Sequence, residues 1–206
     1  MKESYITVAF RETVKQRFPD SAENLIFDMD KRMAQLLADS SEASKEKKRH
    51  LNSQIIPGIA AYETLQKAMS KDEALGVVHG YVEKNAWKLR KAILKLMRIP
   101  GLYKCVPGLF AKGTRKMFGE KAGFSATEIQ TADGVWRIDM TKCPYHDACG
   151  KYGCPELCHC FCDSDDITYD NMHPKLLWHR TKTLGRGNDC CDFCLKIEEG
   201  KNEISH

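Results

Sequence analysis

The spacing of apolar residues changes once along this 206-residue chain, close to Pro107-Gly108. Before that point, apolar side chains recur every third or fourth residue, which is typical of amphipathic helices. Beyond it, Trp136, Ile138 and Met140 occupy alternate positions, which is typical of a β-strand with one buried face. The sequence therefore predicts an α+β fold in which a helical N-terminal half packs on a small antiparallel β-sheet.

Three helical segments are predicted in the N-terminal half. Apolar side chains at helical spacing mark residues 26–37 and residues 59–69. Ser70-Lys71-Asp72-Glu73 is a capping-box sequence, and the amphipathic pattern that follows it continues to Pro100-Gly101. We expect one long helix between these two signals.

The second half predicts two β-hairpins. Residues 124–130 can pair with the strand at 135–140 across an Asp-Gly turn. Residues 176–184 can pair in the same way with residues 191–197. Between the hairpins, Pro155 is placed to begin a short helix that is rich in cysteine.

Length and composition fit a folded protein with a substantial core. The chain is 42% hydrophobic and 29% charged, which is too apolar for a disordered protein. We divide it into a helical region at residues 1–106 and a Cys-rich α+β catalytic region at residues 107–206. We expect the two regions to form one compact unit together.

Cysteine is concentrated in the second half. Nine of the ten cysteines lie between Cys143 and Cys194. Thiolates are the side chains best suited to nucleophilic attack and to soft-metal binding, so we expect the chemistry of the protein in this segment. The N-terminus does not lead into the apolar segment of a signal peptide, and no apolar run is long enough to cross a bilayer. We therefore expect a cytoplasmic protein whose cysteines are reduced.

Three of these cysteines are candidate metal ligands. If Pro155 begins a helix, Cys154, Cys158 and Cys162 lie four residues apart on one face. Paired C-x-x-C motifs are missing, so buried free thiols that act as small apolar side chains are the alternative. We expect no cofactor, and zinc or an iron–sulfur cluster at these three cysteines is the alternative. The side chains that could complete a tetrahedral site are Cys143, His146 and Cys149.

The strand predicted at 191–197 separates two groups of side chains. Cys191 shares one face with apolar residues, whereas Asp192 lies on the other face. Cys191 is therefore either a core cysteine or a nucleophile at the wall of a pocket. Arg180 is predicted on the neighbouring strand, where its guanidinium either binds a substrate carboxylate or bridges to an aspartate of segment 163–170.

A basic segment begins in the long predicted helix. Ten Lys or Arg and no Asp or Glu occur between Lys84 and Lys116. The first part of the segment places a stripe of cations on one helix face, which either attracts the phosphates of nucleic acid or of an anionic membrane, or is simply a solvated face. Because nucleic-acid-binding motifs are missing, we expect no nucleic-acid partner, and the apolar helical half is compatible with a homodimer. The stripe consists of Lys84, Lys88, Lys91, Lys95 and Arg98.

Three ordered sequence blocks lie in the Cys-rich region. The blocks are Cys143-Pro144-Tyr145, Cys162-x-x-Asp165, and Arg180-Thr181-x-Thr183-Leu184-x-x-Gly187 followed by Cys191-Asp192-Phe193. Together they resemble the L-2-amino-thiazoline-4-carboxylic acid hydrolase family, and the resemblance covers about Trp136 to Leu195.

The resemblance implies hydrolytic opening of a cyclic thioimidate. In L-2-amino-thiazoline-4-carboxylate, the ring carbon bonded to sulfur and to two nitrogens is electrophilic, and the addition of water there gives N-carbamoyl-L-cysteine. The substrate would be a small anionic molecule. The alternative is a noncatalytic sensor module that binds a small molecule or a metal.

The resemblance also implies roles for residues in the blocks. A thiolate attacks the ring carbon, with Cys191 as the first choice ahead of Cys143 and Cys162. Asp165 or Asp192 protonates the ring nitrogen or activates water, and in a rival mechanism the aspartate activates water without any covalent step. The residues implied in substrate binding are Arg180, which holds the carboxylate, with Thr181, Thr183 and His146.

Overall fold

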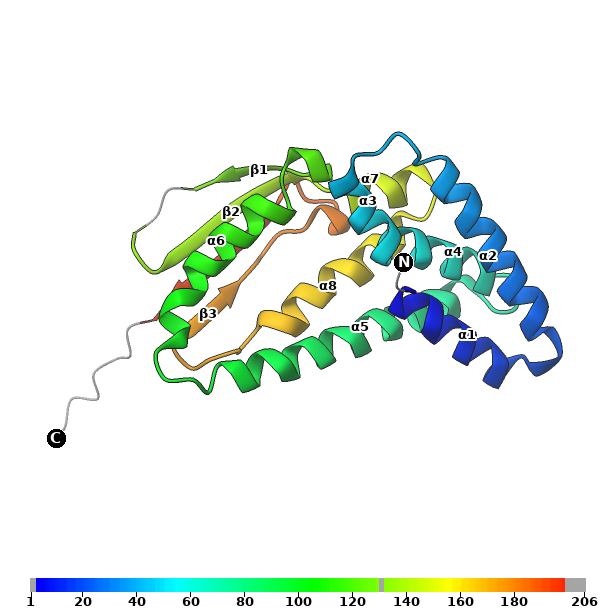
Figure 1. The fold of residues 1–206 in the computed structure, drawn as a ribbon, viewed down its shortest axis with the longest axis horizontal. Helices are drawn as coiled ribbons and strands as arrows, with labels where there is room; N and C mark the ends of the chain where they lie inside the picture. The colour runs from blue at the N-terminus through cyan, green and yellow to red at the C-terminus, as the bar shows by residue number, and fades with distance from the viewer. Residues whose placement is uncertain (1–2, 130–131, 199–206) are drawn as a thin grey trace.

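The computed structural model describes residues 3–129 and 132–198, and it has helices at one end and a sheet at the other (Figure 1). Helices α5 and α8 lie side by side and connect the two ends. The helices are α1 (Tyr5–Arg17), α2 (Ala22–Ala38), α3 (Lys45–His50), α4 (Ile56–Leu65), α5 (Lys71–Leu96), α6 (Val106–Met117), α7 (Pro144–Lys151) and α8 (Cys158–Tyr169); the strands are β1 (Ser125–Glu128), β2 (Val135–Lys142), β3 (Leu176–His179) and β4 (Cys191–Ile197).

The four described strands form one antiparallel sheet in the order β1-β2-β4-β3. Trp136, Ile138 and Met140 of β2 are buried, as their alternation predicts. The register of β2 against β4 places Met140 opposite Cys191. The α+β class and both hairpin pairings are thus confirmed, with the last predicted residue of the first strand, Gln130, lying outside the described residues.

Strand β3 is shorter than the sequence predicts. Its pairing with β4 ends at His179, so Arg180 follows the strand and does not lie on it. Beyond this point Asp192 accepts hydrogen bonds from the backbone N–H groups of Thr181 and Lys182, at 2.8 and 2.6 Å. These bonds to a side chain replace the backbone pairing that a longer strand would need.

The Cys-rich helix also begins later than predicted. Pro155–Leu157 form a 3₁₀ turn, in which the N–H of Leu157 donates to the carbonyl oxygen of Cys154 at 3.0 Å. Helix α8 then begins at Cys158, so Cys158 and Cys162 share a helical face. The expectation that Cys154 stacks on the same helical face is wrong, because Cys154 precedes both the turn and the helix.

Helix α5 begins where the sequence predicts. Glu73 accepts a hydrogen bond from the N–H of Ser70 at 3.0 Å, and Ser70 Oγ accepts one from the N–H of Glu73 at 3.3 Å. This reciprocal pair satisfies two backbone donors at the start of the helix. Within the described part of the chain, no helix combines the length and the apolar character needed to cross a bilayer.

One buried core joins the N-terminal helices to the Cys-rich segment. Phe10 of α1 and Tyr62 of α4 belong to the same cluster as Cys149, Cys158 and Phe161. A second cluster, which includes the two buried tryptophans of the sheet, packs under α6. The cysteine-bearing elements are therefore held by the helical layer on one side and by the sheet on the other.

We predict that Gly58→Ala destabilises the protein. A Cβ atom at Gly58 would lie 2.6 Å from Cζ of Phe161, which is buried where α4 packs against α8. Overpacking of this kind costs about 1–3 kcal/mol, and the gain in helix propensity offsets at most about 1 kcal/mol. The matched control is Gly76→Ala on α5, where no atom lies within 4 Å of the added carbon. Chemical denaturation should show Gly58→Ala lowering and Gly76→Ala raising the free energy of unfolding; a gain for both would contradict the packing argument.

Candidate functional site

Three of the candidate cysteines converge from different elements. Cys143 is the residue between β2 and α7, Cys162 lies on α8, and Cys191 is the first residue of β4. A negative charge on Cys162 or Cys191 would raise the pKa of Cys143, so the three sulfurs lie within electrostatic reach of one another. The fold thus brings together thiols that lie as far apart in the sequence as Cys143 and Cys191.

The three thiols have different surroundings. Burial raises the pKa of half-buried Cys143 to about 12, against the lowering effect of hydrogen bonds from the backbone N–H groups of His146 and Tyr145 at the start of α7. Burial also raises the pKa of Cys191 to about 11, and its Sγ accepts one hydrogen bond, from the N–H of Leu184 at 3.3 Å. A hydrogen bond with Cys158 and burial both raise the pKa of Cys162. All three cysteines are therefore thiols at neutral pH in the ligand-free protein.

Arg180 forms the charged part of the site. Only 2% of its side chain is exposed, and its Nη1 lies 3.4 Å from Asp165. Its Nη2 donates to Asp166 and, at 3.0 Å, to the carbonyl oxygen of Cys162. The bridge to aspartates of segment 163–170, one of the two sequence-based alternatives, is therefore formed.

Asp165 is the titratable carboxyl group of the site. Desolvation by the surrounding protein raises the pKa of Asp165 to about 6. The positive charge of Arg180 opposes this increase, and the negative charge of Asp166 adds to it. The Asp165 side chain is nevertheless 40% exposed, so small molecules can reach it. A carboxyl group with this pKa can both accept and release a proton near neutral pH.

Tyr145 and His50 complete the site, and the sequence reasoning did not assign a role to either. His50 Nε2 lies 3.0 Å from the carbonyl oxygen of Met117, which can only accept, so Nε2 carries the proton and Nδ1 faces the Tyr145 hydroxyl at 3.4 Å. Burial lowers the pKa of His50, which keeps the ring neutral. Burial raises the pKa of Tyr145 well above its usual value, and the charges of Cys143 and Asp165 add to this.

Comparison with known families covers most of this structure. The sequence model described as L-2-amino-thiazoline-4-carboxylic acid hydrolase matches residues 48–195, which is more than half of the chain. The chain belongs to this family. The match begins within α3, so it includes α4, α5 and α6, which the three sequence blocks did not reach, but not α1 or α2. Comparison with curated proteins found no match.

The residues of the site all lie within the range matched by the L-2-amino-thiazoline-4-carboxylic acid hydrolase family. They are Cys143, Cys162, Cys191, Asp165, Arg180, Tyr145 and His50. His50 contacts Tyr145 across 95 positions of sequence, so no local motif could have revealed it. Tyr145, in contrast, stands in the first sequence block beside Cys143, and its position there was the available signal.

Four candidate residues of this family member, Asp192, Thr181, His146 and Thr183, have side chains that no described contact links to the three thiols. Asp192 faces away from Cys191 on β4 and accepts hydrogen bonds from Thr181, including one from the Thr181 hydroxyl at 2.5 Å. Burial would raise the pKa of Asp192, but hydrogen bonds from Thr181 and Lys182 outweigh it and lower the pKa. The Asp192–Thr181 pair therefore fixes the segment after β3.

The remaining two candidates differ in exposure. The side chain of His146 is exposed, so it is the backbone N–H of His146 that faces Cys143. Thr183 is buried, its N–H donates to Asn188 at 3.1 Å, and its hydroxyl has no hydrogen-bond partner in the described residues.

A row of further thiols leads from the site into the core of the hydrolase-family fold. Each thiol raises the pKa of the next in this row: Cys154 that of Cys149, Cys149 that of Cys158, and Cys158 that of Cys162. Gly185 packs so closely that a Cβ there would lie 3.0 Å from the sulfurs of Cys158 and Cys162. Among residues 3–129 and 132–198, no group of three or more His, Cys, Asp or Glu side chains is arranged to hold a metal ion, and this includes the candidate set Cys154, Cys158 and Cys162.

Proposed function

We propose that this protein hydrolyses L-2-amino-thiazoline-4-carboxylate, or a close cyclic thioimidate relative, to N-carbamoyl-L-cysteine. The observation that carries the proposal is the convergence of residues from all three sequence blocks at one place, in a chain of this hydrolase family. This hydrolysis adds water to the ring and changes no oxidation state. It needs a nucleophile and a group that moves protons near neutral pH, and both types of side chain are present.

Cys143 is the thiol that we assign as the nucleophile. Its sulfur lies at the start of α7, where the backbone N–H groups of Tyr145 and His146 act to lower its pKa against the larger raising effect of burial, and donors in that position stabilise a thiolate as it forms. Cys143 is also half-buried, whereas Cys191 is 5% exposed and faces one such N–H group, that of Leu184. The geometry therefore supports Cys143 over Cys191, the first choice from the sequence.

The first half of the reaction replaces the ring sulfur by the enzyme sulfur. As the Cys143 sulfur bonds to the electrophilic carbon, its proton passes to the carboxylate of Asp165, which with Cys143 flanks Tyr145. The carbon–sulfur bond of the ring breaks, and the departing sulfur takes that proton from Asp165. The product of this half is an isothiourea that joins Cys143 to the opened cysteine chain.

The second half releases the enzyme. Asp165 removes a proton from water, the water oxygen bonds to the same carbon, and the bond to Cys143 breaks. The proton returns to the Cys143 sulfur, so one water has been added overall and the product is N-carbamoyl-L-cysteine. Arg180 acts as a positioning residue in this scheme because its donors hold Asp165 and Asp166. A substrate carboxylate can reach Arg180 only by competing for Nη1, whose 3.4 Å contact with Asp165 is long.

Turnover is the direct test. The purified protein should convert L-2-amino-thiazoline-4-carboxylate into a product heavier by one water, identified by mass spectrometry as N-carbamoyl-L-cysteine, and a metal chelator should leave the rate unchanged. Binding without turnover in the folded protein would instead support the noncatalytic sensor. Turnover that a chelator abolishes would contradict the thiol mechanism.

A further inference from the structure

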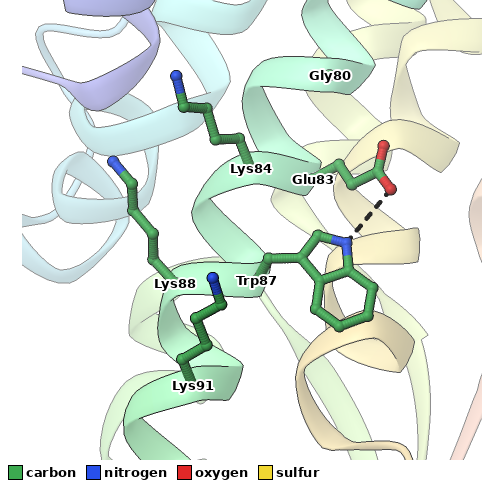
Figure 2. A pocket seen from close by; sticks show the side chains of 6 residues that line it. All are labelled: Gly80, Glu83, Lys84, Trp87, Lys88 and Lys91. Carbon is green, nitrogen blue, oxygen red and sulfur yellow. Dashed lines mark hydrogen bonds between the residues drawn. The ribbon is translucent and has the colours of Figure 1, made fainter.

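The outward face of α5 is basic over its C-terminal half. Figure 2 shows Lys84, Lys88 and Lys91 projecting from one side of the helix, while the indole of Trp87 points the other way and donates to Glu83 at 3.4 Å. Together with Gly80 and Glu83, these side chains line a shallow hollow of about 440 Å³. Lys95 continues the stripe by one further turn and is exposed as well. None of these four lysines forms an ion pair within the residues that the structure describes.

Large apolar side chains are exposed on both sides of this stripe. Trp87 and Leu94 lie seven residues apart on one edge, whereas Leu89 and Leu96, also seven residues apart, lie about a quarter turn beyond the other edge. The exposed fractions are 47% for Trp87, 47% for Leu89, 37% for Leu94, 54% for Leu96 and 53% for Ile99.

The exposure of Leu89 and Leu96 on α5 needs a physical explanation. Val78 and Val82 of α5 are buried, but Leu89 and Leu96, which continue the same helical stripe, are not. A solvated lysine face needs no such flanks, and apolar patches of this kind mark binding surfaces. We call Lys84, Lys88, Lys91 and Lys95, with the exposed Trp87, Leu89, Leu94, Leu96 and Ile99 of α5 and the turn after it, the basic–apolar surface.

We infer that the basic–apolar surface binds the anionic face of a phospholipid bilayer. The four exposed lysines of this surface form no ion pair within the described residues, and such a row of cations complements lipid phosphates and carboxylates. Leucine, isoleucine and tryptophan side chains beside the lysines can enter the boundary between headgroups and acyl chains. The protein would therefore lie on a membrane without crossing it.

Two other occupants fit the surface less well. A second copy of this chain would bring two sets of lysines together with Glu83 as the one carboxylate among the residues that line the hollow, and the excess of like charges at such an interface is repulsive. Nucleic acid would be attracted by the lysines, but single strands are held by stacking on aromatic rings, and Trp87 is the only exposed aromatic side chain of the surface.

Vesicle sedimentation tests the inference with the full chain. Phosphatidylcholine vesicles that contain about one third phosphatidylserine should bind the protein, whereas pure phosphatidylcholine vesicles should not, and salt should weaken the binding. Each lysine near such a surface contributes about fivefold in affinity, so Lys84→Gln/Lys88→Gln/Lys91→Gln should weaken binding about 100-fold. The control is Lys15→Gln/Lys45→Gln/Lys121→Gln, which removes the same charge from exposed lysines elsewhere and should bind like the natural protein.

The apolar edges have separate readouts. Leu94→Ser/Leu96→Ser should weaken vesicle binding while the lysines remain. Trp136 and Trp178 are buried, so a blue shift of tryptophan emission on vesicles would report the exposed Trp87 entering the interface. Equal binding of both triple variants, tighter binding to nucleic acid than to vesicles, or a concentration-dependent dimer that Leu94→Ser/Leu96→Ser abolishes would each overturn the inference.

Discussion

Cys143→Ser should lower kcat/KM for L-2-amino-thiazoline-4-carboxylate by about 10³-fold or more, because a hydroxyl group is a far weaker nucleophile than a thiolate. Serine is close to cysteine in size and can accept the same hydrogen bonds from the N–H groups of Tyr145 and His146. The variant should therefore fold normally. Steady-state assays of carbamoyl-cysteine formation, with a denaturation curve for each protein, separate lost chemistry from lost structure.

Cys194→Ser is the matched control for this experiment. Cys194 is also half-buried, lies on β4, and faces away from Cys191, so its loss should leave turnover intact. Full activity in Cys143→Ser with loss in Cys191→Ser would move the nucleophile to Cys191. Full activity in Cys143→Ser, Cys162→Ser and Cys191→Ser alike would eliminate covalent capture and leave an aspartate that activates water.

The fold followed from the sequence where periodicity and capping agreed. The alternation of Trp136, Ile138 and Met140 predicted a strand with one buried face, and the capping box at Ser70 predicted the start of α5. Both signals are local: they depend on side chains within one element and on the solvent on either side of it. These two predictions therefore hold whichever element the strand or helix packs against.

One prediction failed because of a contact across the fold. The strand expected to continue past His179 ends there because Asp192, a residue of β4, accepts hydrogen bonds from the backbone N–H groups of Thr181 and Lys182. Such competition between side-chain and backbone hydrogen bonds leaves no periodic signal in the sequence. The helix expected at Pro155 begins late for a local reason, since Pro155–Leu157 form a 3₁₀ turn and α8 begins at Cys158.

The candidate site could be predicted only in part, because some of its contacts depend on how distant segments pack. The sequence blocks named Cys143, Cys162 and Asp165, and the structure brings these residues together. The tautomer of His50 and its contact with Tyr145 could not be read from the sequence, since they depend on where the carbonyl oxygen of Met117 lies. Three-dimensional packing, rather than motif spacing, decides such contacts.

Asp165→Asn should lower kcat/KM by about 10²–10⁴-fold, the usual effect of losing a group that transfers protons. In the natural protein the active form of Asp165 is the carboxylate, and its pKa is raised to about 6. Activity should therefore fall as pH decreases through about 6, where the carboxylate becomes protonated, and level off above that value. In Asp165→Asn the residual activity should lose this acid limb.

The neighbours of Asp165 set where the acid limb lies. The charge of Asp166 raises the pKa of Asp165, so Asp166→Asn should shift the limb to lower pH. Trp178 donates to Oδ1 of Asp166 at 2.9 Å and Arg180 donates to Oδ2, whereas asparagine has a single acceptor oxygen, so Asp166→Asn keeps one of these two hydrogen bonds and a denaturation curve must accompany its pH profile. Asp163→Asn removes a charge from the same helix but one that pairs with Arg186, at 2.8 Å, and should leave the limb in place.

The direction of the shift separates two roles for the Arg180–Asp165 contact. If Asp165 carries the proton, pH profiles of kcat/KM must move with Asp166→Asn and stay fixed with Asp163→Asn, because Asp166 is the one of these two carboxylates that raises the pKa of Asp165. If Asp165 serves only to hold Arg180 in place, Asp165→Asn would lower activity equally at every pH and retain the acid limb. That second outcome would leave Arg180 as the residue that meets the substrate carboxylate and would transfer the proton-carrying role away from Asp165.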